Sequence, residues 1–264
     1  MAGYVGDVAT PYDQDLGPVL FEHYGADIAQ RTTQRALRDV LEIASGTGIV
    51  TRELRDALSK DARLTAVDIS DAMLDVARAK FLPHEQVTFQ IADATALPYD
   101  DATFDAVVCQ FGVMFFDQDA AFREANRTLR NGGRYLFSVW DSEHYNPFAS
   151  LTFEVLKRFF PSNTPRFLFD PVSCHEIDPI KEKLVRSGFK RITISIQPRE
   201  HDIMDVSAFA RALIFSPVIF EIRERGDVDP EEIAQALTQA LIQEFGSNPT
   251  RYPMQAILFE AEKS

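Results

Sequence analysis

Short apolar runs alternate with amphipathic stretches through the first half of the chain. Each run is apolar throughout rather than at every second residue, which is typical of strands buried on both faces of a parallel sheet. This pattern predicts five strands, at 39–45, 64–69, 87–93, 104–111 and 134–140. The stretches between them, such as 70–81 and 119–130, place apolar side chains three or four residues apart, as on one face of a helix. Strands that alternate with helices favour right-handed βαβ units and a parallel sheet.

Helices dominate the prediction for the rest of the chain. Residues 141–175 are rich in Phe and Pro and are expected to form a loop and a helix. Asp229 followed by Pro230 is a typical helix start, and the apolar side chains after it recur every fourth residue. The other predicted elements are a helix at 16–31, a helix at 178–189, a strand at 191–198, helices within 205–246 and a last strand at 254–262.

Composition and charge narrow the classes of partner. The 264 residues are 45% hydrophobic and 25% charged, as expected for one globular α/β domain with a helical cap. A formal net charge of −13 argues against a protein that wraps nucleic acid or docks on anionic lipid, because both need a basic face. Cys109 and Cys174 lack metal-like spacing, so no metal site or disulfide framework is expected. No secretory signal and no 18-residue apolar run is visible, so we expect a cytoplasmic protein without a membrane span.

The stretch "VLEIASGTGIVT" (40–51) places a glycine-containing turn between a buried strand and a helix. Glycine lets backbone N–H groups approach a ligand that a side chain would keep away. Gly46 and Gly48 supply this freedom, but Thr51 stands where the G-x-G-x-x-G fingerprint of dinucleotide-binding proteins has its third glycine. No Lys follows the glycines, so the phosphate-binding Walker pattern is absent as well. An acid, Glu42, precedes the turn instead.

Two further acids follow the next two predicted strands. Asp68 ends the second strand, where a carboxylate can accept two hydrogen bonds from a ribose diol. Asp93, in "ADAT", can accept from the exocyclic amine of adenine while the Ala94 N–H donates to the ring. The segment "CQFGVMFF" (109–116) ends the fourth strand. All these loops lie at the carboxyl ends of strands, where open α/β sheets bind their ligands.

Four segments, taken in order and spacing, resemble the successive motifs of the class I S-adenosylmethionine (SAM)-dependent methyltransferases. They are "VLEIASGTG", "AVDIS", "IADATALPYDDATFDAVVCQFGVMFF" and "EANRTLRNGGRYLFSVW", and the strong match covers about residues 35–140. The chain is most similar to the small-molecule methyltransferases related to the ubiquinone/menaquinone biosynthesis enzymes. The resemblance implies an α/β, Rossmann-like seven-stranded sheet with its last strand antiparallel, sandwiched by helices and carrying helical cap insertions. It also implies SAM as cofactor and S-adenosylhomocysteine (SAH) as product.

The resemblance further implies how the chain is divided. The expected parts are an N-terminal helical lid segment at 1–34, a SAM-binding core at 35–140, a substrate-cap insertion at 141–175, and the C-terminal part of the sheet at 176–264 with a helical insertion at 203–250.

The family's motifs, carried onto this sequence, imply a cofactor site. The residues around the methionine part are Glu42, Ala44, Ser45, Gly46 and Gly48. Asp68 takes the ribose, and the residues around the adenine are Ile69, Met73, Asp93 and Ala94. Gln110 and Phe111 lie near the reactive sulfur, and Tyr12 belongs to a segment that folds over the cofactor in similar enzymes. Ala44 departs from the family, which usually has Gly there, and Ala fits only if that backbone is not left-handed.

The loop after the fifth strand is expected to face the substrate. His144 is the best-placed general base in it, because imidazole exchanges a proton near neutral pH. The predicted substrate-binding residues are Tyr4, Phe115, His144, Tyr145, Phe148 and Phe169.

Each of these residues has a structural alternative. The two glycines can be plain turn residues, and Asp68 and Asp93 can be local caps, although Ser70 suits the cap of the helix at 70 better than Asp68 does. Gln110 and Phe111 can be strand-end packing, Tyr4 and Tyr12 an exposed tail, His144 a solvated loop residue and the cap phenylalanines a core of their own.

In-line transfer of a methyl group to a small, partly apolar metabolite is the predicted function. The alternatives are a non-catalytic SAM-binding protein, an NAD-dependent oxidoreductase on a similar fold, or another reaction, such as cyclisation, on the same scaffold. The expected partner is a small-molecule methyl acceptor and not nucleic acid, and the chain is expected to be a monomer or a homodimer.

Overall fold

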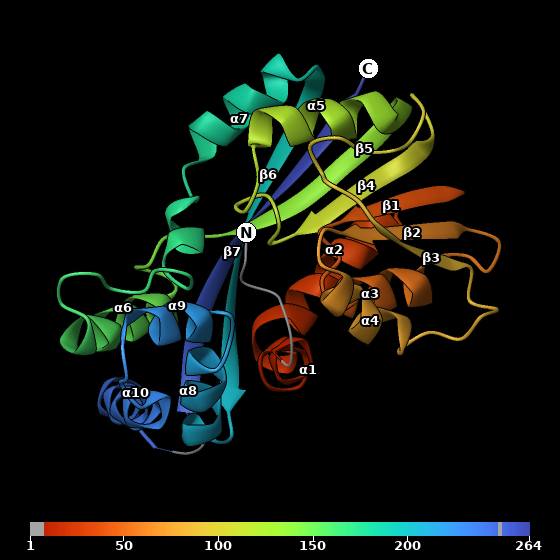
Figure 1. Cartoon of the computed structure of the whole chain (residues 1–264). Coiled ribbons are helices and arrows are strands. Elements are labelled where there is room, and N and C mark those ends of the chain that lie inside the picture. The colour runs from red at the N-terminus through yellow and green to blue at the C-terminus, as the bar shows by residue number, and fades with distance from the viewer. Residues whose placement is uncertain (1–7, 248–249) are drawn as a thin grey trace. The chain divides into compact units, whose positions relative to one another are not determined.

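The computed structural model describes residues 8–247 and 250–264 and contains one seven-stranded sheet (Figure 1). The strand order is β3-β2-β1-β4-β5-β7-β6. The strands are β1 (Asp39–Ile43), β2 (Arg63–Asp68), β3 (Val87–Ile91), β4 (Phe104–Gln110), β5 (Leu129–Trp140), β6 (Phe189–Ile203) and β7 (Thr250–Lys263). Neighbours from β3 to β5 run parallel, and β7 runs antiparallel. The predicted α/β fold with an antiparallel last strand is confirmed.

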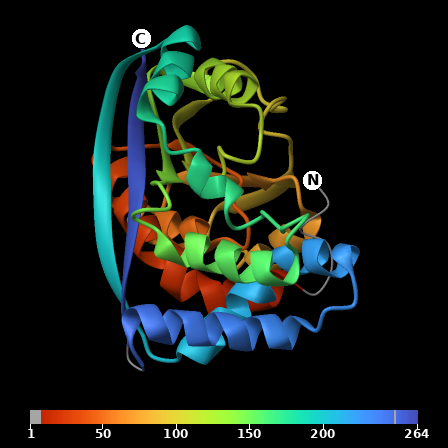
Figure 2. The same cartoon turned by 90° about the vertical axis from the view of Figure 1, so that its left-hand side faces the viewer.

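The chain forms two compact units. The sheet unit comprises residues 21–139, 176–196 and 257–264, and the helical unit comprises residues 1–20, 140–175 and 197–256. Strands β6 and β7 are neighbours in the sheet, visible as the long cyan and blue arrows in Figure 2, and each supplies residues to both units.

The sheet unit buries its central strands between helices. All five residues of β1 are buried, as expected for a strand that pairs on both sides and is covered on both faces. Helix α2 (Glu22–Thr32) packs against α3 (Ile49–Ala57), and α4 (Asp71–Arg78) packs against β2 and β3. Helices α5 (Gln118–Thr128) and α7 (Ile177–Arg186) pack together on the opposite side of the strands (Figure 1). One apolar cluster joins α2 and α3 to strands β1, β2, β4 and β5. Its members include Ile28, Val40, Leu54, Leu64, Val108 and Leu136.

Local signals placed most strand and helix ends correctly. The first four strands end within two residues of their predicted limits. Ser70 caps α4 as expected, because its hydroxyl accepts from the Met73 N–H at 3.4 Å. Three strands are longer than predicted: β5 begins at Leu129, β7 runs from Thr250 to Lys263, and β6 runs from Phe189 to Ile203 through Pro198. A proline is tolerated there because β6 is the outermost strand and one of its sides carries no ladder.

The N-terminal helix differs from the prediction. Residues Tyr12–Phe21 form a π-helix, η1, before the chain continues as α2. Pro18 lies inside η1, and in an α-helix its ring would collide with the carbonyl group four residues earlier. In a π-helix the hydrogen bonds run from residue i to residue i+5, and this wider turn moves that carbonyl group away from the ring. The proline therefore explains why this segment is a π-helix and not the predicted α-helix.

The helical unit is built around its last helix. Helix α10 (Pro230–Phe245) packs against α6 (Pro147–Phe159) and α8 (Val206–Ile214). The predicted cap is confirmed, because the Asp229 side chain accepts from the Glu231 N–H at 2.9 Å. Three residues of the predicted stripe, Ile233, Leu237 and Leu241, are fully buried. The remaining elements are α1 (Ala9–Pro11), η2 (Asp170–Ser173) and α9 (Val218–Arg225).

Candidate functional site

The turn after β1 adopts the backbone that its glycines allow. Gly46 and Gly48 have φ angles of 54° and 81°, in the left-handed region. A Cβ added to Gly46 would meet no atom within 4 Å, so the backbone there is open to a ligand. A Cβ on Gly48 would lie 2.9 Å from the Cβ of Ala77, so this glycine lets the start of α3 pack closely on α4. Only the first of the two glycines leaves room for a ligand.

Ala44 is left-handed as well, with φ of 54°, contrary to the condition under which Ala was expected to fit. This conformation costs an L-residue on the order of 1 kcal/mol, because Cβ crowds the following carbonyl oxygen. The Ala44 methyl group is accommodated by Gly112 in the loop after β4, where an added Cβ would lie 2.6 Å from it. The two loops therefore fit each other closely, and glycine is needed at one of the two positions.

Asp68 ties the turn to the end of β2. Its Oδ2 accepts from the Gly46 N–H at 2.8 Å, and its Oδ1 accepts from the Ser70 N–H at 2.9 Å. Burial raises the pKa of this carboxyl group, against the lowering effect of the N–H groups of Ser70, Gly46 and Ile69. Each carboxylate oxygen has a second lone pair, so Asp68 can still accept from a ligand's hydroxyl groups while it holds the turn.

Glu42 lies beneath the same turn with 2% of its surface exposed. The hydroxyl of Thr51, in the first turn of α3, donates to Glu42 Oε2 at 2.6 Å. Burial raises the pKa of Glu42 to about 8, opposed by the hydrogen bond from Thr51 and reinforced by the charge of Asp68. Within residues 8–247 and 250–264, no ion pair reaches Glu42 or Asp68, so no neighbouring cation offsets the charge of Asp68, which favours a cationic ligand. The sequence analysis did not identify Thr51 as a site residue, although a hydroxyl group one helical turn after Gly48 could have indicated a partner for Glu42.

The loop after β3 presents a polar and an apolar surface. Asp93 is exposed, and its Oδ1 accepts from both the N–H and the hydroxyl of Thr95, at 2.8 and 2.7 Å. Ala94 and Met73 are buried, whereas Ile69 at the end of β2 is 52% exposed. An exposed isoleucine at the end of β2 is a surface that a flat apolar ring can cover.

The loop after β4 holds the start of α2. Gln110 Nε2 donates to the Phe21 carbonyl group at 3.0 Å. Phe111 is buried and left-handed, with φ of 52°, and its ring meets Tyr24 edge-on at 5.6 Å and Phe21 at 6.0 Å. Phe115, also predicted, is half-buried in the same loop. Gln110 and Phe111 thus have packing roles of their own.

The predicted residues of the helical unit fall into two groups. His144 and Tyr145 are exposed, with their rings 4.8 Å apart, and Tyr12 is half-buried in η1. Phe148 is buried against Trp140, and Phe169 stacks on Phe153 at 4.6 Å, so both contribute to the packing of this unit. Tyr4 lies outside the described residues.

Asn146 fixes the loop that carries His144 and Tyr145. Its side chain is fully buried, and Nδ2 donates to the carbonyl groups of Asp141 and Gln255 at 2.8 and 2.9 Å. Its Oδ1 accepts from the Gln255 N–H at 3.0 Å, so the loop is fastened to β7. Sequence reasoning missed this residue, because its partner lies 109 positions away.

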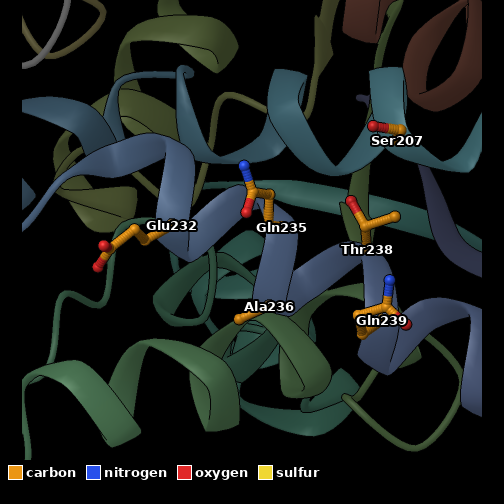
Figure 3. A pocket seen from close by; sticks show the side chains of 6 residues that line it. All are labelled: Ser207, Glu232, Gln235, Ala236, Thr238 and Gln239. Atoms are coloured by element: carbon orange, nitrogen blue, oxygen red, sulfur yellow. The ribbon is translucent and has the colours of Figure 1, made fainter.

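A separate pocket of about 560 Å³ lies in the helical unit (Figure 3). Ser207 lines it from α8, and α10 supplies Glu232, Gln235, Ala236, Thr238 and Gln239. None of the predicted site residues lines this pocket, and its lining offers neither a buried acid nor a glycine turn. Among the described residues, no group of three or more His, Cys, Asp or Glu side chains is placed to hold a metal ion. Nor is any helix in that part of the chain both long and apolar enough to cross a membrane.

Comparison with known proteins shows which family part of this chain resembles. Residues 40–133 match the family described as methyltransferase domain. A ubiquinone/menaquinone biosynthesis C-methyltransferase from Hahella chejuensis is 38% identical over 125 residues, which are 46% of this chain and 50% of that protein. A second such enzyme, from Shewanella oneidensis, is 28% identical over 58% of this chain and 66% of its own length. The chain thus spans about half to two thirds of the length of these curated relatives.

Solved structures share the fold at low sequence identity. The YcgJ protein from Bacillus subtilis superposes with a TM-score of 0.59 at 19% identity, covering 91% of this chain and 98% of that one. Phosphoethanolamine N-methyltransferase 2 from Haemonchus contortus, in complex with S-adenosyl-L-methionine, gives 0.59 at 17% identity, covering 97% of this chain and 56% of the other. Such a likeness establishes the fold alone.

Proposed function

Because this chain carries a methyltransferase domain of the class I SAM-dependent type, we propose that it transfers a methyl group from SAM to a small, partly apolar acceptor. One observation carries the proposal: the turn after β1 is open at Gly46 and held in that shape by Asp68, at the carboxyl end of the sheet. The curated relatives are C-methyltransferases by name, which makes carbon the first acceptor atom to test.

The residues present fit a nucleoside with a positively charged tail. Asp68 keeps lone pairs for the two ribose hydroxyls, and exposed Ile69 offers an apolar surface to the adenine, backed by buried Met73. Asp93 and the Ala94 N–H supply the polar contacts of the adenine edge. The residues proposed for the methionine end are Glu42, Ala44, Ser45, Gly46 and Gly48, and those near the sulfur are Gln110 and Phe111, with Tyr12 in the proposed lid segment.

The protein's own side chains position the two reactants and favour binding of the positively charged cofactor. SAM, when bound, would supply a sulfonium methyl group whose carbon–sulfur bond breaks as an electron pair of the acceptor, a π pair in the case of carbon, bonds to the methyl carbon. The electron pair of the broken bond stays on sulfur. The carboxylate of Asp68 favours binding of the positively charged cofactor, while buried Glu42 stays protonated near neutral pH. Holding the acceptor and methyl group in line accounts for much of the acceleration in such reactions. His144 is proposed to receive the acceptor's proton where the acceptor has one to lose.

The finer points follow from the same proposal. The substrate-binding residues are proposed to be Tyr4, Phe115, His144, Tyr145, Phe148 and Phe169, with the two phenylalanines of the helical unit acting through its packing. A small molecule, and not nucleic acid, is the proposed acceptor, and the proposed oligomeric state is a monomer or a homodimer. A cytoplasmic location stays a prediction that cell fractionation can test.

Calorimetry with SAM, SAH and NAD tests the cofactor first. We expect micromolar binding of both sulfur compounds and none of NAD, and binding at least tenfold weaker in Asp68→Asn. Asn retains one oxygen for the Gly46 N–H, so this variant separates ligand contact from loss of the turn better than Asp68→Ala does. NAD binding without SAM binding would favour the oxidoreductase alternative. Folded protein that binds none of the three would end the proposal.

Transfer itself is tested with tritiated SAM and a panel of naphthoquinols, phenols and primary amines. Labelled product from one class of compound is the expected result. SAM binding without transfer to any compound of the panel would favour the non-catalytic alternative.

A further inference from the structure

Two buried side-chain oxygens without a hydrogen-bond partner lie at the carboxyl ends of β4 and β5. They are Gln110 Oε1 and the hydroxyl of Ser138, whose residue is only 1% exposed. Gln110 and Ser138 are register partners at the end of the β4–β5 ladder. Beyond this pair the chain turns away at left-handed Phe111, whose N–H still donates to the Ser138 carbonyl group at 3.0 Å.

The register brings the two oxygens within reach of one small group. Register partners on parallel strands lie about 5 Å apart, and their side chains point to the same face of the sheet. The Gln110 amide is fixed, because its nitrogen donates to the Phe21 carbonyl group and leaves the oxygen as a free acceptor. An O–H or N–H group placed over this end of the two strands, on the face to which both side chains point, can therefore donate to Gln110 and also pair with the hydroxyl of Ser138.

Leaving such oxygens unpaired is costly for a folded protein. A buried hydroxyl or carbonyl group without a partner destabilises the fold by about 1–3 kcal/mol, and alanine at position 138 would avoid this cost. Unpaired polar side chains at the ligand-binding edge of a sheet are typical of groups that form their hydrogen bonds with a bound ligand.

The strand order indicates which part of the reactants lies next to Gln110 and Ser138. In the proposed function the adenine contacts lie at β3, the ribose contact at β2 and the methionine contacts at the turn after β1, and the next strands along the sheet are β4 and β5. We propose that Gln110 and Ser138 hold the polar group of the methyl acceptor, by hydrogen bonds from its O–H or N–H. This inference rests on the proposed function and makes Ser138 a specificity-determining residue. An amide oxygen and a serine hydroxyl at this site orient the acceptor and take no proton from it.

Ser138→Ala tests the inference, with Ser216→Ala as a matched control. Ser216 also has a 1% exposed side chain whose hydroxyl is buried and unpartnered, but it lies between α8 and α9 in the helical unit. The probes are SAH, by calorimetry, and the panel compound that the wild-type chain methylates best. We expect the melting temperature of both ligand-free variants to equal or exceed that of the wild type. The SAH dissociation constant should stay within twofold in both, and only Ser138→Ala should raise the acceptor KM, by about tenfold.

Several results would overturn the inference. An acceptor KM equal in the two variants would remove Ser138 from the site. Weaker SAH binding at unchanged acceptor KM would assign the two oxygens to the cofactor's amino group. A melting temperature several degrees lower in Ser138→Ala than in Ser216→Ala would mean that the hydroxyl is paired within the protein. Failure of the proposed function gives a different result, namely a wild-type chain that methylates nothing in the panel, and the inference falls with it.

Discussion

Replacing Glu42 by Gln removes an acid that the fold holds in a fully buried place, and the effect on stability should depend on pH. The pKa of Glu42 rises from 4.5 to about 8 on folding, chiefly because burial disfavours the charged form. Between these pH values the folded chain keeps a proton that the unfolded chain has released. The native state then binds more protons than the unfolded state, so the free energy of unfolding falls as the pH rises through this window.

The size of the effect follows from the shift. A rise from 4.5 to about 8 corresponds to a destabilisation of about 5 kcal/mol at pH 8 and above, at about 1.4 kcal/mol per unit. Gln keeps an oxygen for the Thr51 hydroxyl but brings a buried amide nitrogen, which costs about 1–2 kcal/mol if it finds no partner. Glu42→Gln should therefore be more stable than the wild type by about 3 kcal/mol at pH 8.5, and no more stable at pH 5.

Urea unfolding followed by circular dichroism at pH 5, 7 and 8.5 measures this difference. Glu232→Gln, on the exposed face of α10, removes the same charge without removing a buried carboxyl group and should change stability by less than about 0.5 kcal/mol at every pH. A Glu42→Gln variant that is equally stable or less stable than the wild type at pH 8.5 would refute the argument that burial dominates at this carboxyl group.

Substitutions at three further positions test the geometry of the site. Asp68→Asn should raise the SAH dissociation constant at least tenfold and lower the melting temperature less than Asp68→Ala does, because its one oxygen still accepts from the Gly46 N–H. Equal SAH binding in wild type and Asp68→Asn would contradict the ribose role. Gly112→Ala should lower the free energy of unfolding by about 1–3 kcal/mol, because its Cβ would come 2.6 Å from that of Ala44, and urea unfolding that shows no loss would dispute the close fit. Asn146→Ala should cost about 2–4 kcal/mol, since it removes the side-chain partners of the Gln255 N–H and of the Asp141 carbonyl group, and a smaller loss in the same assay would mean that water replaces the side chain.

Short-range signals made much of the fold predictable. The apolar runs located β1 to β4 within two residues. For β1 and β4 the reason is that a strand buried on both faces has to be apolar along most of its length, whereas β3 is largely exposed although its sequence predicted a buried strand. The caps at Ser70 and Asp229 were predictable for a similar reason, since a cap and the N–H that it accepts lie two or three residues apart.

Features that depend on distant atoms were not predictable. The left-handed Ala44 is accommodated by Gly112, far along the chain, and Gly48 is explained by Ala77 on a neighbouring helix. The apolar pattern near the N-terminus predicted a helix in the right part of the chain, but it did not predict that Tyr12–Phe21 form a π-helix. That depends on where the ring of Pro18 meets a carbonyl group.

The candidate site divides in the same way. Sequence spacing brought the acids and glycines to one edge of the sheet, because the carboxyl ends of parallel strands meet there. It gave no sign that Asp68 also holds the Gly46 N–H, or that Thr51 donates to Glu42, since both contacts depend on how the turn closes.

The two backbone bonds of Asp68 limit how the nucleotide preference of this fold can be redesigned. Accepting a cofactor analogue with a bulky or charged group on the ribose normally calls for a shorter or basic side chain at the end of the second strand. Here the same carboxylate fixes the N–H groups of Gly46 and Ser70, so such an exchange would release the turn and the cap of α4 together. An orthogonal cofactor pair built on this scaffold therefore needs a new acceptor for those N–H groups before the ribose contact can be altered.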